Sequence, residues 1–167
     1  MTIPMKNLRR AITATADEIN RACDTSSRIV NLTASTLSVT EATHDGKVIT
    51  INRAAGTTIT LPAATGSGAT FRFVVGTTIT SNTGVIQVAN ASDIMTGTAF
   101  FSADTGASVV GWETAGDTDT ITFDGTTTGG YKGDFVEIID IASNLFFVKI
   151  LGSATGTEAT PFSAAVS

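Results

Sequence analysis

The side chains that carry most enzyme chemistry are scarce in this sequence. It holds one cysteine, Cys23, and one histidine, His44, among 167 residues. A single cysteine excludes an internal disulfide, and without an evident histidine partner Cys23 is expected to be a small buried or unused thiol. No nucleophile motif such as G-x-S-x-G lies near His44, which is expected to be a solvent-exposed turn residue. The sequence therefore indicates a protein that is not an enzyme and that needs neither cofactor nor metal.

Charged residues and long apolar runs are also few. Charged residues make up 15% of the chain, against about 25% in a typical soluble domain. A surface with so few charges favours burial of part of it in an oligomer or a larger assembly. No run of about 18 apolar residues is present, so no membrane partner is expected. No apolar segment follows the basic residues near the N-terminus, which argues against a secretory signal.

The charges that are present are unevenly spread. Residues 1–53 hold seven Lys and Arg against five Asp and Glu, whereas residues 54–167 hold three against ten. The imbalance predicts two differently charged faces, although a small solvated imbalance explains it equally well. The basic residues have no aromatic residues between them, and the chain has a net charge of −5. Both features disfavour nucleic acid as a partner. The basic residues could instead meet an acidic protein surface; they are Lys6, Arg9, Arg10, Arg21 and Arg28.

Threonine, in contrast, is abundant, at 31 residues. It is β-branched and favours strands, and from Arg28 onward polar and apolar residues alternate with period two. Turn residues separate runs that are expected to be strands at 29–34, 36–40, 47–52, 57–62, 69–75, 84–89, 107–112, 118–123, 134–141 and 144–151. Such spacing predicts an all-β fold, a compact antiparallel β-sandwich or barrel of jelly-roll-like form.

Three regions are expected along the chain. Residues 1–28 form an N-terminal arm with a short helix at 15–24, where Thr15-Ala-Asp-Glu18 matches a capping box. Residues 29–152 form the β-domain. Residues 153–167 are a small, polar C-terminal tail, expected to be loosely ordered or to lie over a neighbouring subunit.

The most apolar stretch, residues 134–151, is expected to form a hairpin about Ser143-Asn144. It would bury side chains on both faces, as a central strand pair or a subunit interface does. The residues expected in the core or a trimer interface are Phe135, Ile138, Phe146, Phe147 and Val148.

Two further groups are candidates for binding. Asp117, Asp119 and Asp124 offer oxygen ligands for a cation such as Ca²⁺ but lack the EF-hand spacing, so they are expected to be solvated acids at a strand edge. Trp112 and Tyr131 could each stack on a sugar ring, although a place in the core or at a rim is expected.

Three segments resemble structural proteins of tailed bacteriophages. Residues 11–24 resemble a segment near the start of such proteins. Residues 45–62, DGKVITINRAAGTTITLP, are similar to a β-stretch of phage capsid decoration (cement, or head-stabilising) proteins and of some fibre-associated modules. The pair 133–140 and 144–149 resembles the closing hairpin of these modules.

The resemblance implies a small β-barrel or sandwich, usually a homotrimer, on the outer surface of the virion capsid. There it would bridge subunits of the major capsid protein and stabilise the head against internal DNA pressure, after synthesis in the cytoplasm of the bacterial host. It supplies no catalytic residues, and residues 1–28 are expected to contact the capsid and neighbouring subunits. Two alternatives stay open: a phage fibre or spike-base module that binds host glycan, and an enzyme of the β-jelly-roll kind.

Overall fold

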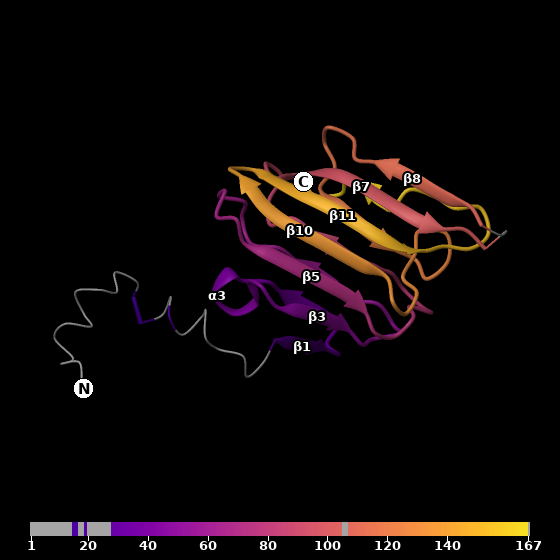
Figure 1. Ribbon diagram of the computed structural model, residues 1–167, viewed down its shortest axis with the longest axis horizontal. Coiled ribbons are helices and arrows are strands. Elements are labelled where there is room, and N and C mark those ends of the chain that lie inside the picture. Colours follow the sequence, from indigo (N-terminus) through magenta and orange to yellow (C-terminus); the bar gives the residue numbers. More distant parts are fainter. Residues whose placement is uncertain (1–14, 17–18, 20–27, 105–106, 167) are drawn as a thin grey trace, which may run out of the picture.

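The computed structural model describes residues 15–16, 19, 28–104 and 107–166, and in these ranges twelve strands form two sheets packed face to face (Figure 1). Sheet A contains, in spatial order, β1 (Ile29–Leu32), β3 (Val48–Ile51), β5 (Thr70–Val75), β10 (Phe135–Ala142), β11 (Leu145–Ser153), β7 (Ile94–Ser102) and β8 (Val109–Glu113). Sheet B contains β12 (Phe162–Ser163), β9 (Thr120–Phe123), β6 (Gly84–Gln87), β4 (Thr58–Thr60) and β2 (Thr36–Ser38). The all-β sandwich that the Thr-rich alternation predicts is confirmed.

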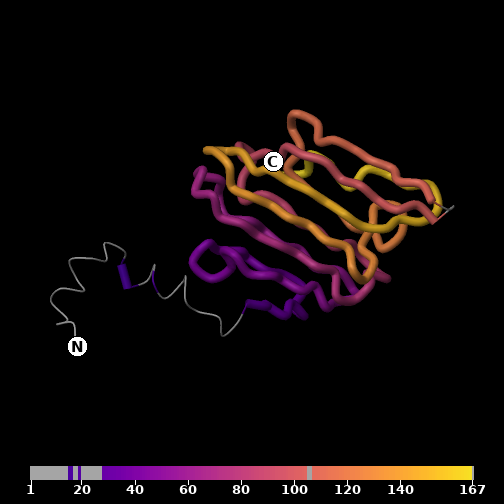
Figure 2. The backbone as a smooth tube through the Cα atoms, in the orientation of Figure 1, coloured from indigo at the N-terminus to yellow at the C-terminus, as the bar shows by residue number. Residues whose placement is uncertain are grey.

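The chain alternates between the sheets from β1 to β6, a path that Figure 2 follows. Within each sheet these strands pair in parallel, β1–β3–β5 in sheet A and β2–β4–β6 in sheet B. Residues 29–87 thus form three turns of a coil, in which a strand of the opposite sheet makes each crossover. The predicted antiparallel arrangement is wrong for this half, because period-two alternation marks a buried face and not the direction of the neighbouring strand.

The second half of the chain completes both sheets mainly through antiparallel pairs. The β10–β11 hairpin turns at Asn144, whose φ of 62° is the left-handed conformation that asparagine tolerates. It joins the coil through β5 and pairs in parallel with β7 through β11. All ten predicted strands overlap a strand of the structure, whereas β7 and β12 were not predicted.

Strand β7 was not predicted because Gly97 interrupts its alternation of polar and apolar residues. A Cβ atom at Gly97 would overlap the carbonyl oxygen of Val148 in β11. The glycine therefore permits a close approach of two backbones, which is a common role of glycine within strands.

The hydrophobic core lies between the sheets, and its side chains form rows across the strands. On sheet A one row contains Val30, Ile49, Phe73, Val136, Ile150, Ala99 and Trp112. The facing row of sheet B contains Leu37, Ile59, Ile86, Ile121 and Phe162. Each fully buried side chain of this kind contributes about 1.5–3 kcal/mol to folding.

The C-terminal segment packs on its own domain, so the expectation of a loose tail is wrong. Strand β12 pairs with β9, and the side chain of Phe162 is buried. The amides of Ala165 and Val166 donate to the carboxylate of Asp119, at 2.8 Å to Oδ1 and 3.2 Å to Oδ2. An edge strand and a buried carboxylate therefore fix this segment.

The N-terminal region is described only at a few positions. Lys6, Arg9, Arg10 and Arg21 lie outside the described residues, as does most of the predicted helix 15–24. The amide of Ile19 donates to the carbonyl of Thr15 at 3.1 Å, which is helical spacing. Arg28 is exposed and directly precedes β1. None of the helical residues that the structure describes belongs to an apolar helix of membrane-crossing length.

Candidate functional site: the outer face of sheet A

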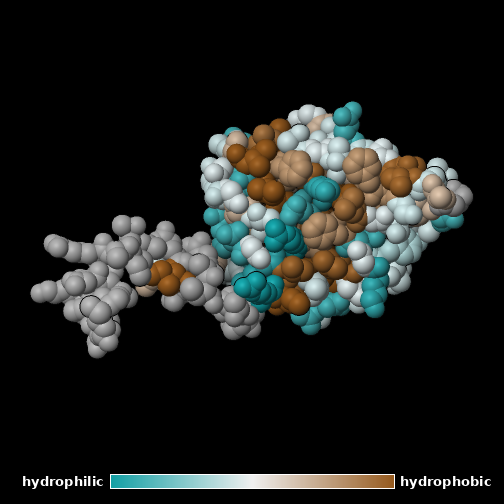
Figure 3. Space-filling model, viewed as in Figure 1, coloured by the Kyte–Doolittle hydropathy of each residue, from teal (hydrophilic) through white to brown (hydrophobic). Residues whose placement is uncertain are grey.

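The two sheets present different outer faces. The outer face of sheet B is made mainly of hydroxyl and amide side chains, contributed by Thr36, Ser38, Thr58, Thr60, Gln87 and Thr122. The outer face of sheet A, the face turned to the viewer in Figure 3, has hydrophobic side chains on both sides of a hydrophilic band. Contiguous exposed apolar surface marks interaction sites on soluble proteins, so the outer face of sheet A is the candidate site.

The hydrophilic band is a row of alternating charges across five strands, here called the charge row. Arg72, Glu137, Lys149, Thr98 and Glu113 are successive cross-strand partners from β5 to β8. Nε of Arg72 lies 2.9 Å from Oε1 of Glu137, with both side chains partly exposed. Opposite charges on neighbouring strands stabilise such a row only modestly, by roughly 0.2–1 kcal/mol per pair.

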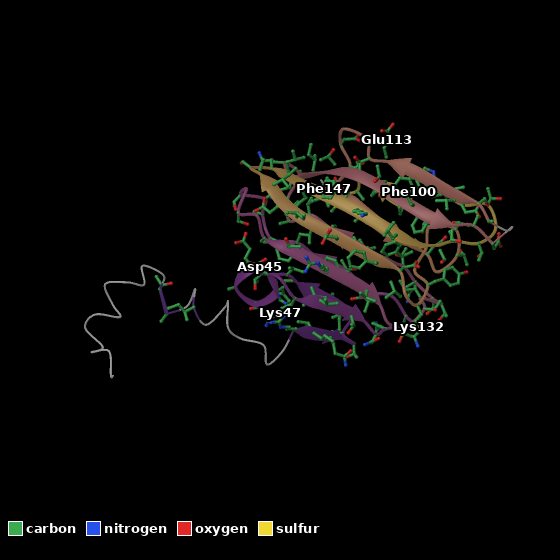
Figure 4. The ribbon with its side chains drawn as sticks, viewed as in Figure 1. Asp45, Lys47, Phe100, Glu113, Lys132 and Phe147 are labelled. Carbon is green, nitrogen blue, oxygen red and sulfur yellow. The ribbon has the colours of Figure 1, made fainter. Side chains whose placement is uncertain are left out.

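An apolar row lies on each side of the charge row. One contains Val74, Phe135, Leu151 and Phe100, which are cross-strand partners in that order. The other contains Ile139 and Phe147, with Thr70 and Thr96 at its ends. Phe100 is 44% exposed and Leu151 43%, so large apolar side chains reach solvent here. Figure 4 shows Phe147 on β11 and Phe100 on β7, with Glu113 at the end of β8.

The predicted core-or-interface residues divide between the two faces of the hairpin. Ile138, Phe146 and Val148 are fully buried between the sheets. Phe135 and Phe147 point the other way and lie half-buried on the outer face of sheet A. The hairpin is thus apolar on both faces because one face serves the core and the other belongs to the candidate site.

At the β8 edge of the candidate site, the position of the Phe100 ring depends on a glycine in the neighbouring strand. Gly111 of β8 is the cross-strand partner of Phe100, and a Cβ atom at Gly111 would lie 3.0 Å from Cδ1 of the Phe100 ring. The ring of Phe100 therefore lies against the glycine of this edge strand, as aromatic side chains do beside edge glycines.

His44 is buried, and the expectation of an exposed turn residue is wrong. It ends the one-turn helix α3 (Glu41–His44), and its side chain folds back onto the start of the turn. The amide of Thr40 donates to Nδ1 of His44 at 3.0 Å. The imidazole accepts a hydrogen bond at this helix start, where the N-cap residue makes no side-chain cap.

The predicted acidic cluster does not form a common site. Asp119 and Asp124 instead accept hydrogen bonds from the backbone and hold loops in place. Asp119 is buried and accepts the C-terminal amides described above. Asp124 accepts the amides of Thr126 and Thr128 at 2.7 and 3.0 Å and so closes its own turn. Burial opposes ionisation of Asp124, but these bonds outweigh it and hold the pKa of the carboxyl well below its usual range. Within the described ranges no three His, Cys, Asp or Glu side chains gather as metal ligands would.

Asp140 and Asp134 are further buried carboxylates that the sequence patterns did not single out. Asp140 accepts the amides of Thr65, Gly66 and Ser67 at 2.7–3.1 Å. Although burial alone would raise the pKa of Asp140, these hydrogen bonds lower it. For Asp134 the balance is reversed, and burial raises its pKa despite hydrogen bonds from the backbone. A signal existed for both residues, because in the predicted strand 134–141 Asp134 and Asp140 alternate in step with the inward-facing Val136 and Ile138.

Neither aromatic residue considered for sugar stacking forms an exposed platform. The ring of Trp112 packs against Phe101, with 5.7 Å between ring centroids. The hydroxyl of Tyr131 lies 2.9 Å from Oγ1 of Thr155, and Tyr131 is half-buried. Both residues serve the fold at these positions.

The arrangement on sheet A suits contact with another macromolecule, because it combines projecting apolar side chains with fixed charges of both signs. Comparisons of this chain with protein-family models, with curated proteins and with solved structures return no match.

Proposed function

We propose that this protein is a virion structural protein, a capsid decoration protein that binds the outer surface of a phage capsid and stabilises the head. The observation that carries the structural role is the outer face of sheet A, where Phe100, Phe147 and Leu151 lie beside a row of charges and are open to contact with other subunits, further copies of this chain included. Such a face suits lasting contact with other subunits. The resemblance of residues 45–62 and of the closing hairpin to decoration proteins points to the capsid as the partner.

In this proposal the major capsid protein is bound by residues 1–28, which carry the basic residues of the arm. Arg28 is exposed beside the edge strand β1, so the arm joins the β-domain at an open sheet edge. Extended segments commonly bind by adding to such edges. Several linked copies would gain avidity from weak single contacts. The homotrimer stays a prediction from the resemblance.

The test is co-sedimentation with capsids that lack this protein. Deleting residues 1–24 should abolish binding while circular dichroism still reports a folded β-domain. A full-length variant with Lys6, Arg9, Arg10 and Arg21 changed to Gln separates the effect of charge from that of length. Normal occupancy of capsids by the truncated chain would contradict the role of the arm.

Immunoelectron microscopy of purified virions tests the location. Antibody to this protein should label heads. Label confined to tails or fibres would instead support the fibre module that binds host glycan, and a glycan array would then identify its ligand.

A further inference from the structure

We infer that the outer face of sheet A binds the same face of a second copy of this chain, about a two-fold axis that runs along the strands between β10 and β11. The inference does not rest on the proposed function, since self-association can occur on or off a capsid. It rests on the self-complementary order of side chains along three rows of the face.

The two central residues of the charge row, Glu137 and Lys149, are complementary under this two-fold operation. The axis keeps each residue at its height along the strands and reverses the order of the strands. Glu137 of one copy then faces Lys149 of the other, and the reciprocal pair forms by symmetry, as in any isologous interface. Within its own copy Glu137 pairs with Arg72 at 2.9 Å and is the cross-strand partner of Lys149, so the charges nearest to Glu137 in both copies are positive.

Both apolar rows match themselves in the same way. On one side of the charge row, Phe135 faces Leu151 of the other copy, and Val74 faces Phe100. On the other side Ile139 faces Phe147. Apolar side chains therefore meet apolar side chains, and between them Glu137 and Lys149 meet opposite charges. Farther from the axis, Arg72 faces the uncharged Thr98, and Glu113 faces Val48, the neighbour of Arg72 in the same row.

Other placements of a second copy are less favourable. A two-fold axis that lies in the interface, perpendicular to the strands and along the charge row, maps that row onto itself, so that Arg72 meets Arg72 and Glu137 meets Glu137. A three-fold axis joins two different patches of surface and does not set this face on itself. A homotrimer would therefore use another surface, and this face would join two such trimers.

The face has the size that a specific interface needs. With the axis between β10 and β11, strand β1 has no counterpart. The other six strands, of four to nine residues, at about 4.8 Å spacing and 3.3 Å per residue, give a projected area of roughly 650 Å². A specific interface of standard size buries about 800 Å² per partner. Two twisted sheets packed face to face align within about 30°, as in β-sandwiches.

The experiment measures particle mass by light scattering coupled to size exclusion, with the full chain. The change Lys149→Glu sets two glutamates against two glutamates across the axis. It should halve the particle mass, from two copies of the 17.1 kDa chain to one, or from six copies to three. Glu137→Lys should do the same. Mixing the two variants in equal amounts should restore the full mass, because each chain then faces the opposite charges.

The matched control is Lys132→Glu, the same charge change on the loop before β10, away from the charge row (Figure 4). It should leave the mass unchanged. Restoration on mixing also shows that both variants are folded. A monomeric wild-type chain at tens of micromolar, an unchanged mass for Lys149→Glu, or no restoration in the mixture would each overturn the inference.

Discussion

The ring of Phe100 lies over Gly111, its partner across strands β7 and β8, where any side chain at position 111 would press on the ring. Gly111→Ala should turn the ring away from β8 with little loss of stability, within about 1 kcal/mol, because the ring is flexible and exposed. The displaced ring alters the apolar row, so self-association should weaken. Chemical denaturation and particle mass, measured on the same sample, separate the two effects.

Gly97→Ala provides a contrast on the same strand. A Cβ atom there overlaps the carbonyl oxygen of Val148, which is backbone and cannot turn away. The variant should lose about 3 kcal/mol or more of its free energy of unfolding, because the β7–β11 pairing must open. Urea denaturation tests this, and a loss no greater than that of Gly111→Ala would contradict the close approach.

Asp140→Asn should destabilise the protein by about 1–3 kcal/mol at neutral pH, since one acceptor oxygen becomes a donor facing backbone amides. The pKa of Asp140 is lowered in the folded state, below the value of about 3.9 in an unfolded chain. Its stabilising contribution is therefore complete above about pH 5 and is lost as the pH falls through the folded pKa.

Asp140→Asn has no titratable group at position 140. The free energy of unfolding of this variant should therefore fall less than that of the wild type between about pH 7 and pH 3. Urea denaturation at both pH values measures the difference. Parallel pH profiles for the two proteins would show that Asp140 does not contribute in this way.

Phe162→Ala tests the attachment of the C-terminal segment. The side chain is 8% exposed and fills the end of the core row of sheet B. Its removal should cost roughly 3 kcal/mol and release residues 160–166 to limited proteolysis. Ser163→Ala, on the exposed face of the same strand, is the control and should change stability by less than about 0.5 kcal/mol. Equal effects of the two changes would argue for a segment that packs loosely.

The positions of most strands were predictable from the sequence because alternation and turn residues are local signals. The direction of pairing was not, since nothing in Val48–Ile51 distinguishes a parallel neighbour from an antiparallel one. His44 looked like a turn residue because its neighbours Asp45 and Gly46 are turn formers. Its burial depends on the way that one turn of helix folds back.

The candidate site was predictable only in part. The apolar character of the hairpin indicated an interface, and Phe135 and Phe147 lie on the outer face of sheet A. The charge row was not visible, because Arg72, Glu137 and Lys149 become neighbours only through the registers of β5, β10 and β11. Phe100 was missed together with β7.

Strand β11 is the sole bridge in sheet A between β10 and the β7–β8 pair. During synthesis β7 and β8 are made before β11. In the nascent chain this pair therefore cannot join sheet A until β11, which ends at Ser153, has been made. The three turns of the coil can assemble earlier, since each turn needs only the one before it. Premature termination before residue 145 would therefore leave β7 and β8 with unpaired backbone, open to association with other chains on the same messenger.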